Sequence, residues 1–122
     1  MKAVIFSKNK MKAQRIEGQI KAAGLKDQIE TILSFEGLFR DVEKNPVDVV
    51  FLDVDDEDTD WESACKMIKF ADSNIWVVLL SENTRAAAKA FELGASDYFV
   101  KPLGKTQLER TLSKLESTSG AQ

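Results

Sequence analysis

The chain has 122 residues, of which 43% are hydrophobic and 30% charged, and its formal net charge is −3. This length suits one compact domain, and the composition excludes disordered and fibrous classes. The chain has no histidine and a single cysteine, Cys65, which excludes histidine-based catalysis, ordinary zinc sites and an internal disulfide. Because no apolar run approaches about 18 residues and no basic stripe stands out, we expect a cytoplasmic protein that binds neither membranes nor nucleic acid.

Strands and helices alternate in the first third of the chain. Residues 2–6 form an apolar run that predicts a strand, and apolar residues then recur at helical spacing until Gly24. Residues 29–33 alternate between apolar and polar, as in a half-exposed strand, and Ser34 can cap the helix that follows. The expected core face of that helix consists of Phe35, Leu38, Phe39 and Val42.

A nearly continuous apolar run over residues 47–52 stops at Asp53 and is followed by an acidic segment. Such a run is typical of a strand that is buried on both faces. The next helix is expected to place Trp61, Ala64, Cys65 and Ile68 inward. Residues 75–80 form the most apolar strand, which ends at Ser81.

The last third of the chain predicts two more helices and one short strand. A helix with Ala87, Ala90 and Phe91 inward ends at Gly94, and residues 97–100 form a strand before Lys101-Pro102. A final helix has Leu108, Thr111, Leu112 and Leu115 on its inner face. We expect the domain to span residues 1–116 and residues 117–122 to be a flexible tail or the start of a linker.

Five consecutive strand–helix units predict a doubly wound α/β domain whose parallel sheet has the strand order 2-1-3-4-5. In this flavodoxin-like architecture the functional site lies beyond the carboxyl ends of the strands. The residues expected there are Ser7, Lys8, Asp53, Ser81 and Lys101. A carboxylate with a neighbouring hydroxyl and lysine suits covalent binding of a phosphoryl group, with the aspartate as nucleophile.

These residues carry a resemblance to a known family. The sequence resembles the receiver domain of two-component response regulators over essentially its whole length. The resemblance implies that Asp53 is the phosphoacceptor, that Ser81 is the switch hydroxyl and that Tyr98 is the aromatic that rotates inward with it. The segment from Gly94 to Pro102 is the most specific part of the match. In this family the bond before the proline is usually cis, so we expect a cis bond between Lys101 and Pro102.

The end of the first strand departs from the family pattern. Receivers usually carry two adjacent acids there that hold Mg²⁺, whereas this chain has Ser7 and Lys8, and no acid precedes Glu17. Mg²⁺ needs anionic oxygen ligands, so we expect no ordinary metal site. Lys8 is instead expected to donate to Asp53. The residue after the switch hydroxyl, commonly small in the family, is Glu82, which would repel a phosphodonor. Trp61 stands where the family commonly has a glycine, so we expect the loop after Asp53 to have a different conformation.

Asp55 leaves two alternatives open. Its side chain should face the same pocket as Asp53, so the two aspartates are weak candidates for a cation site. Asp53-Val54-Asp55 also resembles the motif of haloacid dehalogenase-type phosphatases, in which the second aspartate is a general acid. That family places the motif after its first strand and adds a cap, for which this chain is too short.

We therefore expect an atypical receiver, not an enzyme, that acts as a protein-interaction module with poor or absent phosphorylation of Asp53. A conventional receiver phosphorylated by a histidine kinase, with Mg²⁺ as cofactor, is the alternative. Expected partners are signalling proteins such as a histidine kinase or an output domain. By family analogy, the contact surface, including that of a possible homodimer, comprises the fourth helix, the fifth strand and the last helix.

Overall fold

The computed structural model describes residues 1–25, 28–55 and 60–120. Its strands are β1 (Lys2–Phe6), β2 (Gln28–Ile32), β3 (Val49–Asp53), β4 (Trp76–Ser81) and β5 (Asp97–Val100). Its helices are α1 (Lys10–Ala22), α2 (Phe35–Lys44), α3 (Trp61–Ala71), α4 (Ala87–Glu92) and α5 (Lys105–Gly120). The strands form one parallel sheet in the order β2-β1-β3-β4-β5, which confirms the predicted topology.

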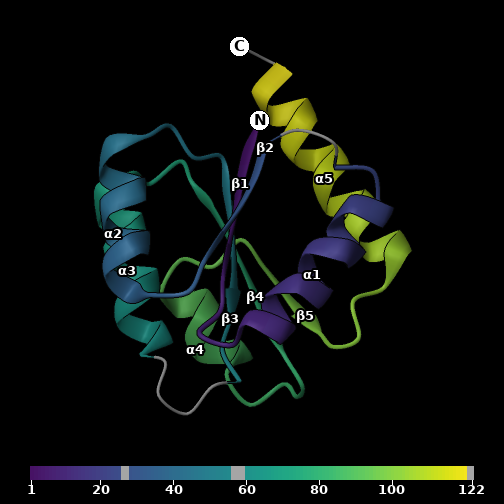
Figure 1. Ribbon diagram of the computed structural model, residues 1–122, viewed down its shortest axis with the longest axis horizontal. Coiled ribbons are helices and arrows are strands. Elements are labelled where there is room, and N and C mark those ends of the chain that lie inside the picture. Colours follow the sequence, from purple (N-terminus) through teal and green to yellow (C-terminus); the bar gives the residue numbers. More distant parts are fainter. Residues whose placement is uncertain (26–27, 56–59, 121–122) are drawn as a thin grey trace.

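Helices cover both faces of this sheet (Figure 1), with α1 and α5 on one side and α2 and α3 on the other. Each face has its own apolar core, and side chains from alternate positions of β1, β3 and β4 enter one core or the other. All five residues of β3 are buried. The strands with continuous apolar runs therefore occupy the centre of the sheet, and the more polar β2 lies at its edge.

The predicted helix boundaries have clear local causes. The side chain of Ser34 accepts a hydrogen bond from the Gly37 amide and caps α2, as predicted. Asp60 caps α3 in the same way, through the Ser63 amide. Gly24 and Gly94 have φ values of 111° and 97°, a left-handed conformation that only glycine adopts at little cost, and each follows a helix end.

Two aromatic residues differ from the prediction. Phe39 and Phe91, both expected in the core, are 41% and 52% exposed. In α2 the buried arc is centred on Leu38 and Val42, which leaves Phe39 at its edge, beside α3. Helix α4 has only six residues and buries Ala90 alone, so Phe91 lies outside the arc that contacts the sheet.

The remaining differences concern the ends of elements. Strand β3 starts at Val49 because the backbone of Asp48 bonds to the carbonyl of Lys2 and its side chain accepts from the Lys2 amide. Helix α5 continues to Gly120, past the expected domain boundary at residue 116. Within the described residues, no helix combines the length and apolar content needed to cross a membrane.

Candidate functional site

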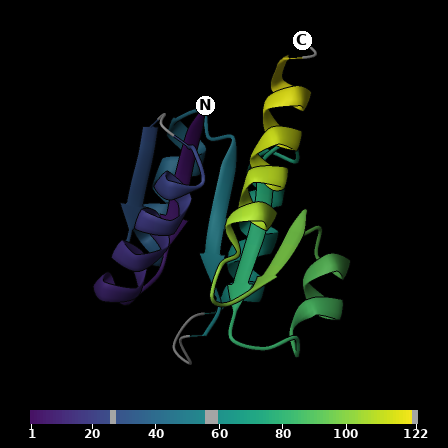
Figure 2. The same cartoon turned by 90° about the vertical axis from the view of Figure 1, so that its right-hand side faces the viewer.

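All five strands run in the same direction (Figure 2), so their carboxyl ends meet at one edge of the sheet. Asp53 and Ser81 are the last residues of β3 and β4. Ser7 directly follows β1, and Lys101 directly follows β5. The structure thus brings together four of the residues that the sequence placed at this edge, and Asp55 joins them.

The carboxylate of Asp53 lies inside the site, with its side chain only 1% exposed. Its Oδ1 accepts hydrogen bonds from the Lys101 ammonium at 2.8 Å and from the Asp55 backbone amide at 3.2 Å. Its Oδ2 accepts from the Ser7 hydroxyl at 3.0 Å. Every oxygen of this carboxylate already has a donor, and access to it from solvent is closed.

The carboxylate of Asp55 is the second acceptor in the site. Its Oδ1 accepts from the Ser81 hydroxyl at 2.9 Å and from the Glu82 backbone amide at 3.1 Å. Its Oδ2 lies 2.8 Å from the Lys101 ammonium. A hydroxyl, an amide and an ammonium therefore converge on one carboxylate.

Lys101 bridges the two aspartates, and the charges stabilise one another. Burial opposes ionisation of Asp55, but hydrogen bonds from Lys101, Glu82 and Ser81 outweigh it and lower the pKa of this carboxyl below its usual value. Burial likewise disfavours the Lys101 ammonium, yet its bonds to Asp53 and Asp55 raise its pKa above the usual value. Both groups are therefore charged at neutral pH.

At the end of β1, Ser7 and not Lys8 faces the acid. Ser7 is 1% exposed, whereas Lys8 lies in the exposed part of the chain, and the described partners of Asp53 are Ser7, Asp55 and Lys101. Successive residues of an extended segment point to opposite sides, so only one of the pair can enter the site. The donor to Asp53 that the structure describes at the end of β1 is therefore Ser7, and the expected bond from Lys8 remains a prediction.

Two features beside the site follow the family pattern. The peptide bond between Lys101 and Pro102 is cis, as predicted. Tyr98 lies on β5, and its hydroxyl donates to the carbonyl of Asn83 at 2.7 Å. The Asn83 amide in turn bonds to the Ser81 oxygen at 3.3 Å, which links the position of the tyrosine to that of the switch hydroxyl.

The described residues at this edge, which exclude 56–59, do not fit an ordinary Mg²⁺ site. Mg²⁺ requires several anionic or neutral oxygens in a near-octahedral arrangement. Here the two carboxylates both contact the Lys101 ammonium, and β1 supplies a hydroxyl whose proton points at Asp53. Among the described residues, no three acids, cysteines or histidines lie together in a metal-binding group.

One functional contact was missed by sequence reasoning, namely the backbone amide of Glu82. Its only signal in the sequence is its position after Ser81, because backbone donors leave no residue pattern. The Glu82 side chain is exposed and lines a hollow of about 300 Å³ together with Lys101 and residues of α1. The proposed rearrangement of the loop before Trp61 concerns residues 56–59, which lie outside the described residues.

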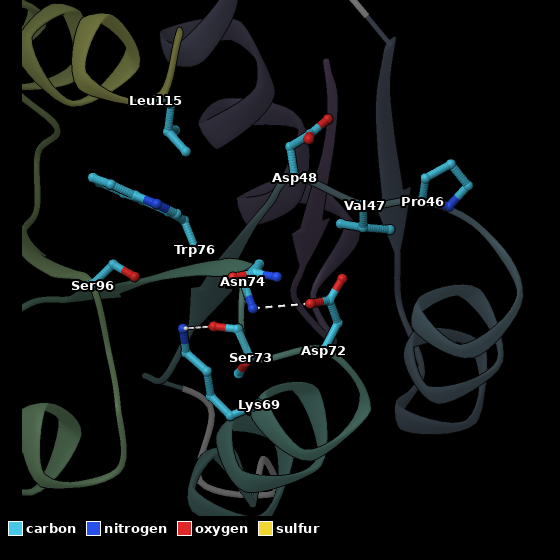
Figure 3. A pocket seen from close by; sticks show the side chains of 10 residues that line it. All are labelled: Pro46, Val47, Asp48, Lys69, Asp72, Ser73, Asn74, Trp76, Ser96 and Leu115. Atoms are coloured by element: carbon cyan, nitrogen blue, oxygen red, sulfur yellow. Dashed lines mark hydrogen bonds between the residues drawn. The ribbon is translucent and has the colours of Figure 1, made fainter. Parts of the chain in front are cut away.

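A second hollow, of about 430 Å³, lies at the opposite edge of the sheet (Figure 3). Its charged groups already have partners within the chain. The Lys69 ammonium donates to the Ile75 carbonyl at 2.6 Å, and Asp72 accepts from the Asn74 amide at 2.9 Å. Burial lowers the pKa of Lys69. These bonds brace the turn before β4, so this hollow has a structural explanation and the first edge remains the candidate site.

The fold and the site together define a signalling module of the receiver type, with an acid, a hydroxyl and a lysine at the ends of three neighbouring strands. The family model of the response regulator receiver domain matches residues 5–113, and the chain belongs to this family. Its members and structural neighbours are signalling modules and not ordinary enzymes. The ionised Asp55 agrees with this, because a carboxylate with a lowered pKa is a poor general acid.

Relatives among curated proteins include the sensory transduction protein LytR of Staphylococcus epidermidis, which is 24% identical over 95% of this chain. Protein MrkE of Klebsiella pneumoniae is 28% identical over 93% of the chain. In both cases the match covers 46% of the relative. The chain thus spans about half the length of these relatives.

Solved structures agree on the fold. The response regulatory domain of MrkE from Klebsiella pneumoniae superimposes with a TM-score of 0.83 at 23% identity, and the match covers 100% of both chains. The BeF3-activated receiver domain of DrrB has a TM-score of 0.77 at 25% identity and covers 95% of this chain and 97% of its own.

Proposed function

We propose that this domain is an atypical receiver that acts as a protein-interaction module and does not depend on phosphorylation of Asp53. One observation carries the proposal: the Asp55 carboxylate engages Ser81, the Glu82 amide and Lys101 at 2.8–3.1 Å. A phosphoryl group on Asp53 carries oxygens that need donors of this kind. In this domain those donors are already bound to an acid of the chain itself.

Electrostatics oppose an incoming phosphodonor for the same reason. A phosphodonor is an anion, and it would approach the ionised carboxylate of Asp55, which lies beside Asp53 and contacts the same lysine. Like charges at a few ångströms repel strongly where burial reduces solvent screening. The Asp53 side chain is 1% exposed, so a phosphodonor can reach it only if the site opens. We infer that this opening requires Asp55 to break its hydrogen bonds and its ion pair with the three donors.

The absence of fitting ligands for Mg²⁺ supports the same conclusion. Phosphoryl transfer in this family would draw transition-state stabilisation from the cation, which neutralises developing charge. A serine and a lysine after β1 offer no carboxylate to hold it. Lys101 provides a positive charge in direct contact with Asp53, at 2.8 Å.

A role in protein interaction needs a surface that partners can reach. The face formed by α4, β5 and α5 exposes Phe91 and Val100, which are 52% and 41% exposed. Tyr98 on the same strand connects this face to Ser81 through Asn83. We propose that signalling proteins, such as a kinase or an output domain, contact this face, and that the arrangement around Asp55 sets its conformation.

The test is to incubate the protein with Mg²⁺ and acetyl phosphate or phosphoramidate and to record its intact mass. We expect no phosphoryl adduct on the wild type, because Asp55 holds the donors and β1 lacks acids. A triple variant, Ser7→Asp, Lys8→Asp and Asp55→Ala, restores the acids and frees the donors, and we expect it to gain one phosphoryl group. Adding Asp53→Asn to it should abolish the gain. Ready phosphorylation of the wild type would instead establish a conventional receiver.

A further inference from the structure

A large apolar side chain is exposed to solvent on the side of the sheet that α2 and α3 cover. Phe70, near the end of α3, is 94% exposed and is the most exposed large hydrophobic residue in the described part of the chain. Isolated exposed apolar residues are common, but this one does not stand alone. Phe39 of the neighbouring α2 is 41% exposed, and both line the same hollow.

That hollow lies between α2 and α3, which run side by side (Figure 1), and has a volume of about 490 Å³. Its apolar lining consists of Phe39, Val42, Met67, Phe70 and Ala71, and Glu43 and Lys44 complete it. A protruding aromatic ring and an apolar hollow thus occupy the same face. A surface that carries both the protrusion and its receptacle is self-complementary, which is the requirement for a two-fold symmetric contact.

The charged residues of α2 and α3 also permit contact with a second copy of the same face. Together α2 and α3 carry four acids, Glu36, Asp41, Glu43 and Glu62, and four bases, Arg40, Lys44, Lys66 and Lys69, of which Glu43 and Lys44 line the hollow. The chain as a whole has a net charge of −3, but the residues of α2 and α3 together carry no net charge. A second copy can therefore approach it without net repulsion and pair acids with bases across the axis.

We propose that the α2–α3 face mediates self-association, with Phe70 of each copy entering the hollow of the other. This surface is separate from the Asp53 site and from the α4–β5–α5 face, so the proposal stands independently of the proposed function. Two helices of 10 and 11 residues are each only about 15 Å long, which makes the contact smaller than a standard interface of about 800 Å² per partner. The dimer is accordingly weak, with a dissociation constant in the range of about 10 μM to 1 mM.

Sedimentation velocity over a concentration series up to about 1 mM tests this proposal. We expect the weight-average sedimentation coefficient of the wild type to rise with concentration from the monomer value toward the dimer value. Phe70→Asp should remain a monomer throughout, because it places a charge at the centre of the contact. Met11→Asp, an equally drastic change at an apolar residue of α1 that is 75% exposed, is the control and should associate like the wild type.

Urea denaturation of each variant checks that the substitution leaves the fold intact, and Phe70→Ser provides a second, uncharged variant. Concentration-dependent amide shifts in NMR spectra should concentrate in α2 and α3. A wild type that remains monomeric over the whole series overturns the proposal. So does association that survives Phe70→Asp, or shifts that concentrate in α4, β5 and α5.

Discussion

The hydroxyl of Ser81 donates its hydrogen bond to Asp55, at 2.9 Å, and not to Asp53. The two residues lie at the ends of adjacent elements, since Ser81 closes β4 and Asp55 lies two residues beyond the end of β3. With the Glu82 amide and Lys101, this bond gives Asp55 three donors, as many as Asp53 has. Several measurable properties depend on it.

Replacing Asp55 with alanine should destabilise the fold. The substitution leaves the buried Ser81 hydroxyl and the Glu82 amide without their acceptor and removes one of the two anions that neutralise Lys101. We expect the free energy of unfolding in urea to fall by about 1–3 kcal/mol. Asp60→Ala, which removes only an exposed cap bond of α3, should cost less, and an equal loss would show that Asp55 is no more than a surface acid.

Replacing Lys101 with methionine should cost more. The apolar side chain preserves the packing but leaves Asp53 and Asp55, which are 1% and 10% exposed, without the ammonium that bridges them. We expect a loss of about 3–5 kcal/mol, as for other broken buried ion pairs. Adding Asp53→Asn should recover part of it.

Lys105→Met is a matched control for that experiment. Lys105 is 71% exposed and pairs with Glu109 across one turn of α5, so its loss should barely change stability. If the two lysine variants lose similar amounts, the bridge at the site contributes no more than a surface pair.

The pH dependence of stability should carry the signature of Asp55. Its folded-state pKa lies below the ordinary value of 3.8, so the stabilisation is complete above that value and is lost as the pH falls through the folded-state pKa. Asp55→Asn should therefore reduce the loss of stability measured by urea unfolding below about pH 4. A slope identical to that of the wild type would show that the carboxylate gains nothing from its donors.

Lys101 should contribute to the loss of folding stability at alkaline pH, as Asp55 does at acidic pH. Its folded-state pKa lies above 10.5, so its contribution is present below that pH and is lost as the pH rises through the folded-state pKa. Lys101→Met should remove this contribution, and unfolding curves recorded from pH 9 upward check it. The same alkaline limb in wild type and variant would contradict the assignment.

Replacing Tyr98 with phenylalanine should loosen the segment after β4. The variant loses the bond to the Asn83 carbonyl while keeping the ring, at a cost of about 0.5–1.5 kcal/mol. Amide hydrogen exchange in residues 82–86 should accelerate by a few-fold. Exchange rates that stay unchanged there would show that the tyrosine does not hold this segment.

Most of the fold could be predicted because its signals are local and repeated. Continuous apolar runs identified β1, β3 and β4 as central strands, and Gly24 and Gly94 identified the ends of their helices. The errors at Phe39 and Phe91 have a common cause. Both residues lie at the edge of the apolar arc of their helix. At such an edge the helical spacing of apolar residues does not determine whether a side chain is buried, because burial depends on the neighbouring helices and on the length of the helix.

The site was predictable in its members but not in its connections. Strand ends in a parallel sheet had to bring Asp53, Ser81 and Lys101 together, and alternation placed Asp55 on their side. The sequence does not specify side-chain rotamers, so it left open which acid Ser81 and Lys101 would bind. It also did not predict the bond from Ser7 to Asp53, since the expected donor was Lys8 and the inward residue depends on where β1 ends.

The short tether between Asp53 and Asp55 has a further consequence. A single residue separates them, so Asp55 competes with free anions as an intramolecular ligand, at an effective concentration of the order of millimolar or higher. A soluble phosphate compound must overcome this built-in competitor by concentration or affinity before it reaches the donors. At any given supply of a soluble anion, the covalent structure of the chain therefore lowers the fraction of these donors that the anion can occupy.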